Sequence, residues 1–253
     1  MLILNVVLVF LEPTPTVGET KQGYTALSFG RTTSDYVQFR PGDMSAFANS
    51  FTLCSWIKRL HGASESLVLQ YKPGQLVIGG NGYWNYVNRH LNLPGEEFPG
   101  TNVWFHYCLS WAAGGTQRVY INGVEVGSMA ASSSKLRSGG TFCLGNAVTK
   151  NSDYIFGGKM YKLNMFSEQL TSSQIREMAN LGLCSVVEEK YETRQLKWEQ
   201  ILTQQRHGNV RDLDIDCDNS IVSKLETRLA EAERELNQTK KTFRNTKKRL
   251  NRY

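Results

Sequence analysis

A series of short segments rich in aromatic and β-branched residues most strongly limits the folds open to this 253-residue chain. Asn122-Gly123 separates two such segments, and because both positions of an Asn-Gly pair tolerate positive φ, it predicts a tight hairpin. The other segments are Phe51–Ile57, Leu67–Tyr71, Gln75–Ile78, Trp104–Trp111, Thr141–Leu144 and Met160–Phe166. Many short strands between turns predict an all-β fold over residues 24–211, a two-sheet antiparallel sandwich or jelly roll.

One short helix is expected among these strands. Residues 171–181 begin with Thr171 and carry Gln174 three positions later, which is the pattern of a capping box. Gly182 follows as the C-terminal stop.

A different pattern begins near Cys217. Apolar residues then recur at alternating steps of three and four, at Val222, Leu225, Leu229, Ala232, Leu236, Thr239, Phe243, Thr246 and Leu250. This heptad predicts a long C-terminal α-helix that forms a coiled coil, and a single amphipathic helix on another surface is the alternative. Residues 212–253 are therefore expected to be an acidic junction followed by a heptad helix.

The excess of positive over negative charge comes from the last residues of the chain. The formal net charge is +6, but the last 15 residues contain seven Lys or Arg and no acid, and the remainder has 22 basic and 23 acidic residues. A neutral body argues against a nucleic-acid-binding domain.

The first residues favour secretion. Leu2–Leu11 is apolar except for one Asn and has the length of a signal-peptide core, so residues 1–18 are predicted to be a signal peptide. A misassigned start or a first strand are the alternatives. No run of 18 apolar residues occurs, and we expect no transmembrane segment.

The five cysteines suit a secreted chain with two intrachain disulfides and one remaining cysteine that is free or intermolecular. Five reduced thiols in a cytosolic protein are the alternative. No Cys-x-x-Cys pair occurs, which argues against a structural zinc site.

The stretch His106-Tyr-Cys-Leu-Ser-Trp111 resembles the signature of the pentraxin family, with Ala113 where that family has Ser or Thr. Val119–Gly123, Leu144–Asn146, Phe156–Gly158 and Leu163–Phe166 resemble later family motifs in the same order, and Leu196–Trp198 resembles the family's closing Leu-x-Trp strand. The resemblance implies a pentraxin-like jelly roll with a Cys54–Cys108 disulfide buried between its sheets. We further expect Cys143 to pair with Cys184, and Cys217 to form an interchain disulfide beside the heptad helix.

The resemblance also implies Ca²⁺ bound by carboxylates and amides on one face. The sequence has Lys72-Pro-Gly-Gln75 and Asn146-Ala-Val-Thr-Lys150 where the family has acidic runs. Asn146, Asn151 and Asp153 are the remaining candidate metal ligands, with too few charges for a strong site. We expect the usual calcium site to be lost or weakened.

Trp84 and Tyr86, together with Asn151, are candidate ligand-binding residues on an aromatic surface that faces a sugar or a lipid; filling of the core is the alternative. No serine-hydrolase or nucleotide-binding fingerprint occurs, and Glu96-Glu97 does not supply the carboxylate pair of a glycoside hydrolase. We therefore expect no enzyme.

These features predict a secreted, non-enzymatic, pentraxin-like recognition protein. It is expected to bind glycan, phospholipid or protein ligands on surfaces, and to form a homo-oligomer through its C-terminal helix. The resemblance implies a role in innate immunity. The alternative is a structural or adhesive extracellular module, or a fragment of a larger extracellular protein, without calcium-dependent ligand binding.

Overall fold

A computed structural model describes residues 24–60, 67–72, 76–79, 85–87, 90–91, 93, 99–149 and 155–217. The predicted signal peptide and the heptad positions from Val222 to Leu250 lie outside the described residues, so both stay predictions. Within the described ranges, no helix has the length and apolar character needed to cross a membrane.

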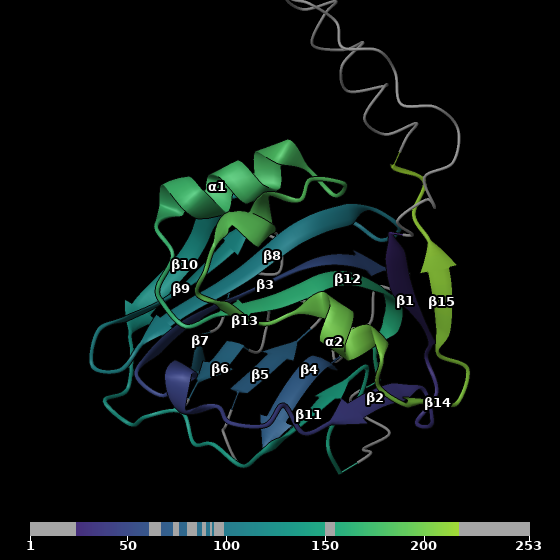
Figure 1. Ribbon diagram of the computed structural model, residues 1–253, viewed down its shortest axis with the longest axis horizontal. Helices are drawn as coiled ribbons and strands as arrows, with labels where there is room; N and C mark the ends of the chain where they lie inside the picture. Colours follow the sequence, from purple (N-terminus) through teal and green to yellow (C-terminus); the bar gives the residue numbers. More distant parts are fainter. Residues whose placement is uncertain are drawn as a thin grey trace, which may run out of the picture.

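The described strands form two antiparallel sheets that face each other (Figure 1). The eight-stranded sheet contains β1 (Thr25–Gly30), β3 (Ser50–Arg59), β8 (Trp104–Ala112), β9 (Thr116–Ile121), β10 (Val124–Ala130), β12 (Gly157–Phe166), β13 (Arg194–Leu196) and β15 (Arg211–Asp214). The seven-stranded sheet contains β2 (Tyr36–Phe39), β4 (Leu67–Lys72), β5 (Leu76–Gly79), β6 (Asn85–Val87), β7 (His90–Leu91), β11 (Thr141–Leu144) and β14 (Arg206–His207).

The strand orders are β10-β9-β8-β3-β12-β1-β15, with β13 paired to β12, and β14-β2-β11-β4-β5-β6-β7. This arrangement confirms the predicted two-sheet antiparallel jelly roll. The short helices are α1 (Ser172–Leu181), α2 (Trp198–Leu202), η1 (Ser45–Phe47) and η3 (Val187–Lys190).

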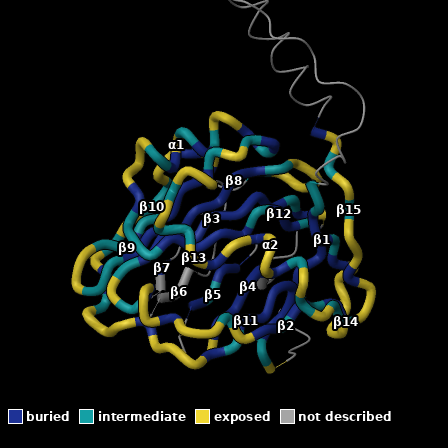
Figure 2. The backbone as a smooth tube through the Cα atoms, in the orientation of Figure 1, coloured by how far each residue is buried: buried dark blue, intermediate teal, exposed yellow. Residues whose placement is uncertain are grey.

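Two clusters of buried side chains hold these layers together. Figure 2 shows the buried positions along the strands of both sheets. The larger cluster lies between the sheets and includes Leu53 of β3 and Leu109 of β8, which are directly opposite each other. The smaller cluster joins the outer face of the eight-stranded sheet to Ile175 and Met178 of α1. Part of the outer face of that sheet is therefore covered by the helix.

The predicted hairpin turn and the predicted helix ends are both confirmed. Asn122 and Gly123 have φ of 50° and 80° and connect β9 to β10 with Ile121 opposite Val124. A Cβ at Gly123 would lie 2.8 Å from Cα of Arg176, so glycine also allows α1 to approach the turn. The Thr171–Gln174 capping box is present, and Gly182 ends α1.

The disulfides agree with the predictions only in part. Cys54 and Cys108 are bonded, as predicted, and lie opposite each other in the β3–β8 ladder. Their location differs, because alternation puts Leu53 and Leu109 between the sheets and leaves both cysteines in the cluster beneath α1.

The predicted Cys143–Cys184 pairing and the interchain role of Cys217 are wrong. Cys184 is bonded to Cys217 within the chain, with Cα atoms 5.4 Å apart, whereas Cys143 is buried in β11 and remains a thiol. The physical reason is β15, which pairs with β1 and brings Cys217 back to the end of α1. The jelly-roll domain therefore extends beyond residue 211. Asp212 and Asp214, the first acidic residues of the expected junction, lie in β15.

Candidate ligand-binding site

The outer face of the seven-stranded sheet is lined by polar and aromatic side chains. In β2, Val37 and Phe39 belong to the core, so the alternation of a strand directs Tyr36 and Gln38 to the opposite face. The ring of Tyr36 stacks on His207 of β14, with centroids 4.3 Å apart and planes at 17°. Tyr36, Gln38 and His207 are all partly exposed. We call these three residues the outer-face platform.

Strand register extends this face across the sheet. Gln38 is opposite Cys143, Cys143 is opposite Gln70, and Gln70 is opposite Val77. The next strand places Tyr86, a predicted ligand-binding residue, opposite Val77. One row thus runs from β2 to β6. Trp84 lies outside the described residues.

The loop after β11 is fixed over this row. Gln70 Oε1 accepts a hydrogen bond of 2.7 Å from Val148 N, and Gln70 and Cys143 are buried. Asn146 is fully buried, where its Oδ1 accepts from Ala147 N at 2.6 Å and its Nδ2 donates to Thr33 O at 3.1 Å. Its side chain therefore shapes the loop.

The described part of the predicted calcium site provides few oxygen ligands for a cation. The Asn146 oxygen is buried and already used, and β4 ends at the exposed Lys72. Asn151 and Asp153 lie outside the described residues, so their metal role stays a prediction. Calcium prefers six to eight oxygen ligands, several of them charged. The described residues of this loop supply no carboxylate.

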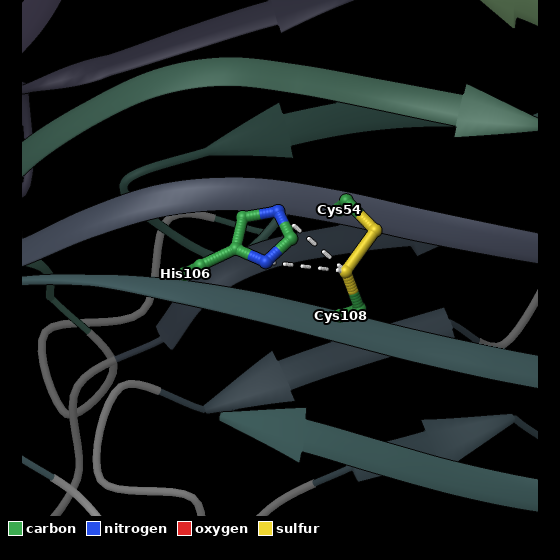
Figure 3. Close-up of side chains that lie close together, drawn as sticks. All are labelled: Cys54, His106 and Cys108. Carbon is green, nitrogen blue, oxygen red and sulfur yellow. Dashed lines mark hydrogen bonds between the residues drawn. A yellow bond between two sulfur atoms is a disulfide. The ribbon is translucent and has the colours of Figure 1, made fainter. Parts of the chain in front are cut away.

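Cys54, His106 and Cys108 form the one group of three or more potential metal-ligating side chains found close together in the described ranges (Figure 3). Both ring nitrogens of His106 lie 3.8 Å from Cys108 Sγ. Both sulfurs are tied in the disulfide, so neither is the thiolate that a soft metal requires.

His106 is instead a neutral part of the core. Burial, and then the positive charge of Lys162, lower the pKa of His106 to about 3. Its ring lies 5.1 Å from that of Trp56 in the same β3–β8 ladder. The cluster is therefore a structural element beneath α1.

The outer-face platform was missed by sequence reasoning. Tyr36 and His207 come from distant parts of the chain, and β14 is only two residues long. The alternation of Tyr36-Val-Gln-Phe39 was the available signal for β2, but four residues are too few to stand out.

Comparison with known proteins supports the fold. The family model of the concanavalin A-like lectin/glucanases superfamily matches residues 31–176, more than half of the chain. No curated protein sequence matches the chain.

Several solved structures share the fold at low identity. A heptameric SAP-like pentraxin from Limulus polyphemus is 17% identical with a TM-score of 0.59, covering 77% of this chain and 96% of its own. A proposed carbohydrate-binding protein from Bacteroides ovatus is 16% identical with a TM-score of 0.57, covering 77% and 61%. The extracellular region of zebrafish Gpr126/Adgrg6 is 15% identical with a TM-score of 0.53, covering 76% and 26%.

Proposed function

We propose that this chain, which belongs to the concanavalin A-like lectin/glucanase superfamily, is a secreted, non-enzymatic recognition protein that binds glycans on extracellular surfaces. The observation that carries the proposal is the outer-face platform of Tyr36, Gln38 and His207. An aromatic surface contacts the apolar face of a sugar, and a neighbouring amide both donates and accepts hydrogen bonds to hydroxyl groups. The two disulfides and the fold are consistent with an extracellular location.

The chemistry of the outer face favours binding over catalysis. Glycoside hydrolases in general use two carboxyl groups on either side of the scissile bond. The described residues placed on this face by strand alternation include Tyr36, Gln38, Gln70, Lys72 and Thr141, and none of the residues in the row from Gln38 to Val77 carries a carboxyl group. We therefore propose a lectin-like role of the pentraxin type, in which calcium is not required because the usual ligand set is largely missing.

Oligomerisation completes the proposal. The heptad segment from Val222 to Leu250 is proposed to join copies of the chain into a homo-oligomer. Weak single sites gain avidity when several are linked, because the second binding event becomes intramolecular. Recognition of microbial or cell surfaces, as in innate immunity, fits such an assembly.

A glycan array tests the proposal directly. Full-length protein is applied with calcium and with EDTA, alongside vesicles of phosphatidylcholine with and without phosphatidylserine. We expect glycan binding that EDTA does not change, a loss of at least tenfold for Tyr36→Ala, and retention for Tyr36→Phe, which keeps the stack on His207.

Three other outcomes of this experiment would contradict the proposal. Binding to phosphatidylserine vesicles alone would point to a phospholipid ligand. If EDTA abolished glycan binding, the binding would depend on calcium, and the calcium-independent site would be wrong. If the protein bound neither glycans nor vesicles under any of these conditions, the alternative of a structural or adhesive extracellular module would be favoured.

A further inference from the structure

A separate cleft of about 230 Å³ opens between the segment that follows β2 and the segment formed by β13 and α2. Its floor is apolar and buried, with exposed fractions of 0% for Met44, 2% for Phe47 and 5% for Leu196. Met44 and Phe47 belong to the turn around η1, whereas Leu196 ends β13. The floor thus joins the turn after β2 to the end of β13.

The rim of the cleft is polar on both walls. Arg40 and Asp43 form one wall, and Gln195 and Gln204 belong to the other. Within the described part of the chain, the exposed guanidinium of Arg40 makes no hydrogen bond or ion pair with another residue. The Gln195 side chain makes one long contact, 3.5 Å from Nε2 to Ser167 Oγ. The side chains of Arg40 and Gln195 therefore remain available to a ligand.

Local hydrogen bonds fix the walls in place. Both oxygens of Asp43 accept from Ser45, at 2.8 Å from its N and 2.7 Å from its Oγ. On the other wall, Gln200 Oε1 accepts from Lys197 N at 2.9 Å and caps α2. The indole Nε1 of Trp198 donates to Thr25 O at 2.8 Å, which ties α2 to β1. The cleft is therefore preformed.

We propose that this cleft is a second binding site, which holds one pyranose ring of a glycan. Its volume lies below the roughly 300–1,000 Å³ of pockets for drug-sized ligands, so it suits a single ring. Pro41, which lines the cleft and is partly exposed, offers apolar surface to the C–H face of a pyranose above the buried floor. The amide of Gln195 offers donors and an acceptor together, as hydroxyl groups do. Arg40 adds a charged donor for a ring that carries a carboxylate.

The cleft is distinct from the outer-face platform, although both use β2. Tyr36 begins the strand and faces outward, whereas Phe39 ends it, faces the core and lines the cleft. Three residues of extended chain separate them by roughly 10 Å. The proposal adds a site to the proposed glycan-binding function and does not depend on the platform.

Methyl-group NMR spectra with three methyl glycosides, of a hexose, an N-acetylhexosamine and a hexuronic acid, test the second site. We expect at least one glycoside to shift the signals of Met44 and Leu196. Gln195→Ala should weaken at least fivefold the binding of any glycoside that binds, and Arg40→Ala should weaken the binding of the hexuronic acid glycoside at least fivefold. Gln205→Ala and Lys135→Ala are matched controls, because both residues are exposed and lie outside the cleft, and they should leave it unchanged.

The two proposals fail separately in this experiment. Tyr36→Ala should leave the shifts of Met44 and Leu196 unchanged, because Tyr36 does not line the cleft. If none of the three glycosides shifts these signals, or if Gln195→Ala and Arg40→Ala bind as the wild type does, the second site is overturned. Binding that responds only to Tyr36→Ala would leave the outer-face platform as the glycan site.

Discussion

The ammonium group of Lys162 lies 3.4 Å from Glu188 Oε2 in an ion pair whose side chains are only 11% and 4% exposed. Lys162 sits at an irregularity of β12 with a φ of 52°, and its Nζ also donates to Ser185 O. Burial lowers the pKa of Lys162 and raises the pKa of Glu188. The pair thus connects η3 to the eight-stranded sheet at the cost of desolvating two charges.

Removal of one partner should therefore destabilise the fold more than removal of both. We expect Glu188→Leu to lower the free energy of unfolding by about 3–5 kcal/mol, since it leaves a buried cation unpaired. Lys162→Met combined with Glu188→Leu should cost less than Glu188→Leu alone. Urea denaturation of the two single variants and the double variant measures the coupling. Strictly additive losses would show that the two side chains do not interact.

His106 should make the fold sensitive to acid. Its pKa is about 3 in the folded protein and about 6.5 in an unfolded chain, so between these values the unfolded state binds more protons. The free energy of unfolding then decreases as the pH falls from about 6.5 toward 3, by up to about 1.4 kcal/mol per unit. Glu188 acts in the opposite sense, because an acid with a raised folded pKa gains stability on protonation.

The variant His106→Asn separates the contribution of His106 to the pH dependence of the free energy of unfolding from that of Glu188. The difference in unfolding free energy between the wild type and His106→Asn should be constant above pH 7 and should shrink steadily from pH 6 to pH 4. Urea unfolding at each pH provides the measurement. A difference that stays constant throughout would mean that the folded and unfolded states hold the His106 proton equally.

The disulfide from Cys184 to Cys217 should appear within single chains. It spans 33 residues, so on the chain-entropy model the double variant Cys184→Ser, Cys217→Ser should lose roughly 3–4 kcal/mol. Peptide mapping without reduction should recover Cys184 linked to Cys217, and Cys143→Ala should keep that link. A Cys217 dimer on a non-reducing gel would contradict the intrachain pairing.

Much of the fold could be predicted because its signals are local. Asn122-Gly123 and the Thr171–Gln174 box each specify backbone conformation within a few residues, and both are confirmed. Long strands rich in aromatic and β-branched residues, such as β3 and β8, were identified for the same reason.

Long-range relationships could not be predicted in this way. The partner of Cys184 depends on β15, a short strand of mostly charged residues whose place is set by pairing with β1. The outer-face platform likewise requires β14 to lie beside β2. Motif resemblance has a similar limit at Leu196–Trp198, because β13 ends at Leu196 and α2 begins at Trp198, so the motif does not form one continuous strand.

Gly208 should tolerate substitution much less than Gly42, although both have positive φ, of 64° and 76°. A Cβ at Gly208 would lie 2.6 Å from Ser34 O and would also collide with the carboxylate of Asp35, whereas no atom lies within 4 Å of a Cβ at Gly42. That carboxylate is fully buried and accepts a hydrogen bond of 2.6 Å from Asn209 N, so it has no room to move.

We expect Gly42→Ala to cost about 1–2 kcal/mol, the usual penalty for a side chain in the left-handed region. Gly208→Ala should cost roughly 2–5 kcal/mol, because overpacking adds to that penalty. The midpoint and slope of urea unfolding for both variants give the comparison. Equal losses would mean that the turn at Gly208 moves away from Asp35 without cost, and the contact between β14 and the loop before β2 would then not hold the C-terminal strands to the sandwich.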